Sequence, residues 1–118
     1  MQDIRLKTVA YEFGGETVEL VCNMNVLADA EEAFGSLRAA LDGGHSLRTA
    51  LTFLTAMLNE WEDAHGRPKR HTVGSVGRQL PPQRLNDLYE VVMPLVTASL
   101  SAEERDEAQD GGDAEKNA

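Results

Sequence analysis

The sequence has one cysteine, few aromatic residues, few positive charges and no long apolar run. Cys22 alone cannot form a disulfide within the chain, which favours a reducing compartment. The chain carries 11 Lys and Arg against 20 Asp and Glu, a net charge of −9, which disfavours binding to nucleic acid or to anionic lipid. The apolar runs are far shorter than the about 20 residues that cross a bilayer. Because aromatic residues make up only 5%, Leu, Val, Ala and Met must form the core.

The length of 118 residues fits a single domain, which we expect to span residues 1–100. Residues 101–118 hold seven acids and two bases, and no Leu, Ile, Val, Phe, Tyr, Trp or Met. Such a segment cannot bury enough apolar surface to offset an ordering entropy of roughly 1–2 kcal/mol per residue. We therefore expect residues 101–118 to form an acidic tail, disordered from about Asp110.

The N-terminal part of the domain predicts a β-hairpin around Gly14-Gly15. A Gly-Gly loop accepts the positive φ angles of a tight hairpin turn. Because an isolated hairpin is marginally stable in water, helices must cover one of its faces. The apolar residues that alternate with smaller or polar ones are Val9, Tyr11 and Phe13 before the loop, and Val18, Leu20 and Cys22 after it.

Capping residues and apolar periodicity predict helices for the rest of the domain, so the fold class is α+β and mostly α. Asn23 or Asn25 can cap the first helix, which ends at Gly35. The strongest signal is the 4-3-4-3 spacing of leucines that leads to Trp61. We expect a small bundle of a helix to residue 34, a short turn from Ser36 closed by Gly43-Gly44, a helix from Ser46 to Ala64, a brief turn capped by Thr72, and a last helix from about Pro82, kinked at Pro94.

The titratable residues show no pattern typical of catalysis or metal binding. Neighbouring acids on a helix point in different directions, so Glu31-Glu32 and the acids near Glu60 do not converge as an acid and base would. Cys22 is expected to be a small buried hydrophobe. We expect no catalytic, cofactor-binding or metal-binding residue and no enzymatic activity. We expect solvated loop histidines at His45, His65 and His71, because no third zinc ligand lies nearby.

Residues 67–71 form the one basic segment of this acidic chain. One interpretation is a solvated loop, and the other is a docking point for the acidic tail of the same or a neighbouring chain.

The wide apolar stripe that ends at Trp61 is either core or a surface for another polypeptide, because aromatic residues are enriched at the centres of interfaces. Under the second interpretation, a groove between residues 47–61 and residues 85–100 holds the partner. The residues expected to line it are Leu54, Leu58, Trp61, Leu88, Tyr89 and Val92.

The order of these segments resembles the small tail assembly chaperones of long-tailed bacteriophages and prophages, especially those of Gram-positive hosts. The resemblance rests on ETVELVCNMNVLADAEEAFGSLRAALDG, then SLRTALTFLTAMLNE, then TVGSVGRQL. It covers approximately residues 9–100, and its weight comes from the order and spacing of the segments.

The resemblance implies a non-enzymatic protein of the bacterial cytoplasm that is absent from the finished virion. Proteins of this family are thought to coat the helical tape-measure protein while tail-tube subunits polymerise around it. The implied partners are the tape-measure protein, the tail-tube protein as a second candidate, and further copies of the chain. In some members a ribosomal frameshift yields a longer product, at a junction that would fall near Ser101. The alternative, based on the net charge, is an acidic inhibitor or antitoxin-like module that masks a basic partner.

Overall fold

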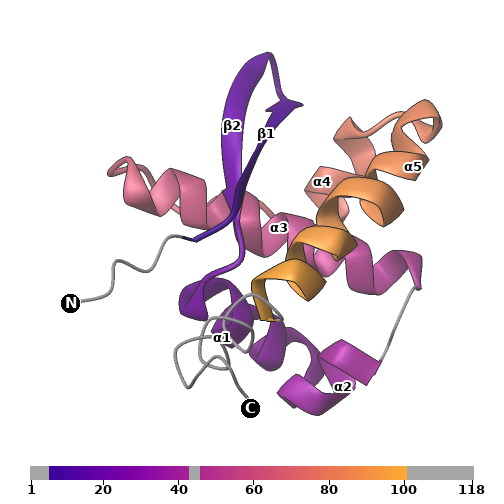
Figure 1. Cartoon of the computed structure of the whole chain (residues 1–118). Helices are drawn as coiled ribbons and strands as arrows, with labels where there is room; N and C mark the ends of the chain where they lie inside the picture. The colour runs from indigo at the N-terminus through magenta and orange to yellow at the C-terminus, as the bar shows by residue number, and fades with distance from the viewer. Residues whose placement is uncertain (1–5, 43–45, 101–118) are drawn as a thin grey trace, which may run out of the picture.

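The predicted hairpin is present in the computed structural model, which describes residues 6–42 and 46–100 (Figure 1). Strand β1 (Thr8–Phe13) pairs antiparallel with β2 (Glu16–Val21). Gly14 and Gly15 have φ angles of 62° and 80°, in the left-handed region that side chains with a Cβ rarely adopt. One face of the hairpin is buried through Tyr11, Phe13, Val18 and Leu20.

Two helices follow the hairpin. Helix α1 (Met24–Phe34) is capped by Asn23 rather than Asn25, because the Asn23 side chain accepts a hydrogen bond from the Val26 N–H at 3.0 Å. Gly35 ends it with a φ angle of 89°. Helix α2 (Leu37–Asp42) packs against α1. The Gly43-Gly44 turn and the tail from residue 101 lie outside the described residues.

Helix α3 (Leu47–Ala64) is the centre of the fold (Figure 1). Ser46 caps it as predicted, accepting from the Thr49 N–H at 3.1 Å. Helix α3 contacts β2, α1, α4 and η2, so its apolar residues are covered from several directions. Among the described residues, no helix is long and apolar enough to cross a membrane. The largest buried side chains include Phe53, Leu54, Met57 and Leu58 from α3 and Leu20 from β2.

Helix α4 (Val73–Gln79) begins with the predicted cap at Thr72, which exchanges hydrogen bonds with Ser75 in a capping box. The last helical segment differs from the continuous helix that the sequence predicts. It begins with a 3₁₀ turn, η1 (Pro82–Arg84), continues through α5 (Leu85–Asp87) and a π-helical stretch, η2 (Leu88–Val92), and stays helical over residues 93–100.

The π-helical stretch lies directly before Pro94, where the sequence predicts a kink. Proline has no N–H to donate to the carbonyl group four residues earlier. In η2 the Met93 N–H bonds to the Leu88 carbonyl, five residues back. A single π turn of this kind lets the helix continue although the hydrogen bond from residue 94 is missing.

Candidate functional site

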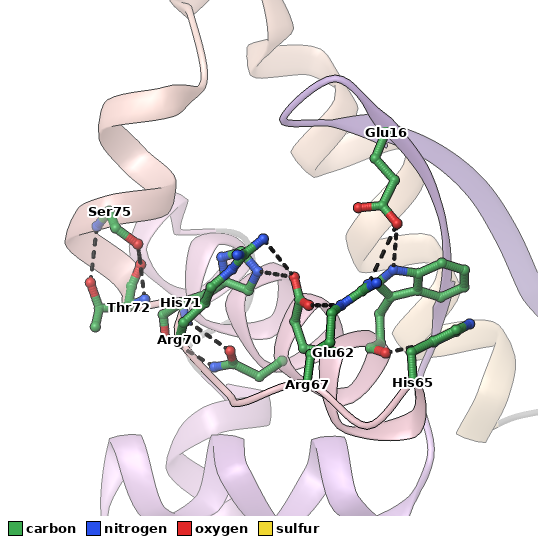
Figure 2. Close-up of polar contacts among 10 residues, drawn as sticks. Glu16, Glu62, His65, Arg67, Arg70, His71, Thr72 and Ser75 are labelled. Carbon is green, nitrogen blue, oxygen red and sulfur yellow. Dashed lines mark hydrogen bonds and ion pairs between the residues drawn. The ribbon is translucent and has the colours of Figure 1, made fainter.

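A buried carboxylate stands at the C-terminal end of α3. Glu62 is only 2% exposed, although glutamate is almost never fully buried unless it is paired. Arg67 Nε donates to Oε1 at 2.6 Å, and Arg70 Nη2 donates to Oε2 at 3.1 Å. His71 Nε2 lies 2.9 Å from the same Oε2 (Figure 2). We call Glu62, these three partners and Glu16 the Glu62 cluster.

The Glu62 cluster joins the hairpin to α3 and to the basic segment. Glu16, at the start of β2, accepts from the Trp61 indole N–H at 3.2 Å. The same carboxylate oxygen accepts from Arg67 Nη2 at 3.5 Å. Figure 2 shows Arg67 placed between the two carboxylates, so one guanidinium group links the hairpin to the end of α3.

The imidazole of His71 is fixed by its own set of contacts. The His71 backbone N–H donates to Asn59 Oδ1 at 2.9 Å, and Asn59 Nδ2 donates back to the His71 carbonyl at 3.0 Å. The Phe13 ring meets the imidazole edge to face at 5.7 Å between centroids. Because its side chain is only 7% exposed, His71 belongs to the packed interior of this region.

The charges around Glu62 keep it ionised. Burial raises the pKa of Glu62, but the hydrogen bonds from Arg67 and His71 and the charges of both arginines outweigh burial, so its pKa is lowered. Both carboxylate oxygens are engaged by cationic or N–H donors. A general base needs a free lone pair directed at its substrate, so this geometry suits a structural joint better than proton transfer.

The contacts of the basic segment bear on its two interpretations. Arg67, Arg70 and His71 pair with Glu62, and Lys69 Nζ lies 3.7 Å from Asp29 Oδ2 in α1. Residues 67–70 are exposed, as the solvated-loop interpretation expects, although their charged side chains are paired. The acidic tail lies outside the described residues, so docking of that tail stays a prediction. The prediction that His71 is solvated is wrong, because its side chain is only 7% exposed.

The sequence holds one signal that could have found this cluster. Glu62 stands four residues after Leu58, on the apolar face of α3, and a loop with three cations follows it closely. An acid on an apolar face needs a partner, and two of the three cations in this loop, Arg67 and Arg70, bind it.

The residues predicted to bind a partner do not form an open groove. The two helices that were expected to flank it pack on each other, and their facing side chains fill the core. Trp61 and Tyr89 are partly buried. The other four predicted residues are buried: Leu54, Leu58, Leu88 and Val92 are 0–3% exposed. The prediction of an accessible groove between these two helices is therefore wrong in this conformation.

An accessible apolar groove does exist, at the opposite end of α3. It has a volume of about 310 Å³. Leu47 and Leu85 are each 44% exposed, which is unusual for large apolar side chains of this chain. We call this feature the leucine groove. It is lined by Leu47 and Leu51 of α3, by Gly77 of α4, and by Leu80, Pro81, Pro82, Arg84, Leu85 and Leu88.

Arg84 connects the leucine groove to the hairpin. Its Nη2 donates to the Glu12 carbonyl at 2.9 Å, and its Nε donates to Asp87 Oδ2 at 2.8 Å. The guanidinium carbon lies 4.5 Å from the centre of the Tyr11 ring, within the range of a cation–π contact. Burial raises the pKa of Tyr11 despite the nearby arginine charge, so its hydroxyl group stays protonated.

The described residues offer no other reactive group in a catalytic setting. Burial raises the pKa of Cys22 to about 11, so the thiol is protonated and a poor nucleophile at neutral pH. Among residues 6–42 and 46–100, no group of three His, Cys, Asp or Glu side chains converges as a metal site would require. Comparisons with protein-family models, with curated proteins and with solved structures find no match to the chain.

Proposed function

We propose that the chain is a non-enzymatic tail assembly chaperone that binds the tape-measure protein and keeps it soluble in the cytoplasm of a bacterial host. The leucine groove carries this proposal, because it is an apolar hollow left open on a small, strongly acidic chain. The order of hairpin, capped helices and final helix, on which the resemblance to that family rests, supports it further.

The physical need for such a chaperone follows from the shape of its partner. A tape-measure protein is a long amphipathic helix, and large exposed apolar surfaces promote association. A groove between helices can cover one apolar face of such a helix. The net charge of −9 would keep the coated rod soluble. Contacts between copies bound along one rod would add avidity.

The test is co-expression of the chain with the tape-measure protein encoded in the same gene cluster. We expect the tape-measure protein to move from the pellet into the soluble fraction and to co-purify with the chain. An unrelated acidic protein of similar size serves as the control. If the tape-measure protein stays equally insoluble with both, the proposal is overturned.

The second candidate is an acidic module that masks a basic partner. One observation favours it: Glu62 and Asp29 pair with the cations of the basic segment and offset part of its positive charge on an acidic chain. Salt separates the two functions. A complex held by surface charges weakens steeply as ionic strength rises, whereas a complex held by apolar burial changes little.

A further inference from the structure

We propose that a pocket between the hairpin, the C-terminal end of α3 and α4 binds an arginine side chain presented by a partner polypeptide. We call it the hairpin pocket, and its lining includes Glu16 of the hairpin, Glu62 of α3 and Arg70 of the loop that follows. This inference goes beyond the proposed function, because the pocket lies at the other end of α3 from the leucine groove and takes a cation.

The size of the hairpin pocket limits its ligand to one side chain or a molecule of similar size. Its volume of about 240 Å³ lies below the roughly 300–1,000 Å³ of pockets that hold drug-sized ligands. A helix, with a diameter of about 10–12 Å including its side chains, is too wide to enter it. A single long side chain of a partner is a suitable occupant.

The charges that line the hairpin pocket favour a cation. Its lining holds two carboxylates, those of Glu16 and Glu62, and one guanidinium group, that of Arg70. The Glu62 carboxylate is ionised at neutral pH, since the groups around it lower its pKa. The whole chain carries −9, which attracts cations and repels anions. The sign of the ligand is therefore positive.

Both carboxylates already bind guanidinium groups of the chain itself, and this sets the chemistry of the ligand (Figure 2). From outside the lining, Arg67 donates to Glu62 Oε1 at 2.6 Å and to Glu16 Oε2 at 3.5 Å. From within the lining, Arg70 donates to Glu62 Oε2 at 3.1 Å. In the part of the chain that the structure describes, Glu16 Oε1 accepts no hydrogen bond, so it can accept one from a further guanidinium group.

Arg70 holds the position on Glu62 for which an incoming arginine would compete. Its side chain is 64% exposed and contacts Glu62 at 3.1 Å, whereas the Arg67 side chain is 42% exposed and contacts Glu62 at 2.6 Å. Arg70 is therefore the easier of the two to displace into water. The exchange leaves the buried carboxylate paired with a cation, which avoids the cost of an unpaired buried charge.

The apolar part of the lining gives the incoming side chain a contact beyond this exchange. Phe13, Val18 and Leu58 line the hairpin pocket and are each at most 7% exposed. The methylene stem of an arginine can cover such apolar surface while its guanidinium group stays with polar partners. A second copy is a poor source of this side chain, because two chains of −9 repel each other. The partner is therefore a different polypeptide with an exposed arginine.

The experiment titrates the full chain with short blocked peptides that carry one arginine, one lysine or one citrulline between glycines. Citrulline has nearly the shape of arginine but no charge, so it is the matched control. Amide chemical shifts measured by NMR detect weak binding and locate it. We expect the arginine peptide to shift the signals of Gly14, Glu16 and His71, which line the pocket. The lysine peptide should bind several-fold more weakly, and the citrulline peptide should leave the signals unchanged.

Three chain variants test which charges hold the arginine peptide, and circular dichroism checks that each is folded. We expect Glu16→Gln to weaken binding about fivefold, because it removes a charged acceptor at a partly exposed position. Glu19→Gln is the control, since Glu19 is exposed on the same strand outside the pocket, and it should bind as the wild type does. Arg70→Ala removes the competing cation and should strengthen binding several-fold.

Four results would overturn the inference. Equal binding of the arginine and citrulline peptides would show that charge is not recognised. Unchanged binding by Glu16→Gln would place the peptide elsewhere. Weaker binding by Arg70→Ala would show that the pocket takes an anion. A dimer of the chain alone that Glu16→Gln dissociates, detected by size exclusion with light scattering, would make a second copy the partner. None of these results bears on the leucine groove, so the proposed function is tested separately.

Discussion

The two ends of α3 differ in the contacts that their side chains make. At the C-terminal end, Glu62 is buried and surrounded by charged and hydrogen-bonding partners, beside the hairpin pocket of about 240 Å³ that Glu62, Arg70 and His71 help to line. At the N-terminal end, about 22 Å away along the helix, Leu47 borders a groove with little charge and partly exposed leucines.

This difference separates the parts of α3 that hold the fold from the part that is free to bind an apolar partner. A buried carboxylate with three partners specifies one arrangement of the chain, because any other arrangement leaves a charge unpaired in the interior. Exposed leucines impose no such requirement. The basic segment, for which the sequence leaves a docking point open, makes structural contacts with α1 and α3, and the apolar end is the better candidate for binding the tape-measure protein.

The largest effect is expected from truncating a leucine in the middle of α3. Leu54 is 0% exposed, so Leu54→Ala should lower the free energy of unfolding by about 3 kcal/mol through lost burial and a cavity. Leu47→Ala, on the same helix but in the groove, should cost less than about 1 kcal/mol. Urea denaturation of both variants measures the difference. Similar costs would mean that the groove is packed as tightly as the core.

The second effect concerns the buried charge. Glu62→Gln removes the negative charge that Arg67, Arg70 and His71 share, and should lower the free energy of unfolding by about 2–3 kcal/mol. The cost stays near the lower end for breaking a buried pair because the two arginine side chains, 42% and 64% exposed, can turn to water. Asp63→Asn, at the exposed neighbouring position, is the control and should change stability little. If Glu62→Gln leaves the free energy of unfolding unchanged, the Glu62 cluster does not stabilise the fold.

The third effect is that acid removes the stability contributed by the ionised Glu62 side chain. Because the pKa of Glu62 is lowered in the folded chain, the unfolded chain takes up this proton first as the pH falls, and folding stability decreases. The stability difference between wild type and Glu62→Gln should be constant above the ordinary glutamate pKa of about 4.3 and shrink below it. Denaturation of both proteins between neutral and acidic pH gives this difference. A difference that grows in acid would contradict the assigned direction of the pKa shift.

The smallest effect is expected at Lys69. Its ammonium group lies 3.7 Å from the Asp29 carboxylate, and both side chains are substantially exposed, so Lys69→Ala should change the free energy of unfolding by no more than about 0.5 kcal/mol. Addition of salt should reduce even this difference. A cost as large as that of Glu62→Gln would show that the basic segment is held to α1 as firmly as to α3.

The sequence predicts the fold well wherever a few neighbouring residues determine the structure. The loop glycines of the hairpin, the end of α1 at Gly35, the cap at Ser46 and the capping box at Thr72 are all local. In each case a side chain or a glycine satisfies the backbone within a few residues, so the sequence carries the full signal.

The candidate site depends on contacts between distant residues, and here the sequence is a weaker guide. Glu62 and Glu16 are brought together by the packing of the hairpin on α3, which no local pattern encodes. The stripe that contains Leu54 was equally consistent with core and interface, since both require an apolar face. The π turn before Pro94 is not predictable in the same way. A proline indicates that one helical hydrogen bond is lost, but it does not indicate that the neighbouring N–H groups bond five residues back instead of four.

The contacts of the basic segment also make it a reporter of local opening. Trypsin cuts after lysine and arginine but not before proline, so Pro68 protects the bond after Arg67 and leaves Lys69 and Arg70 as cleavable positions. Cleavage requires an extended backbone, which the pairing of these two side chains with α1 and α3 opposes. The rate of tryptic cleavage at Lys69 and Arg70 therefore measures how often the basic segment detaches from α1 and α3.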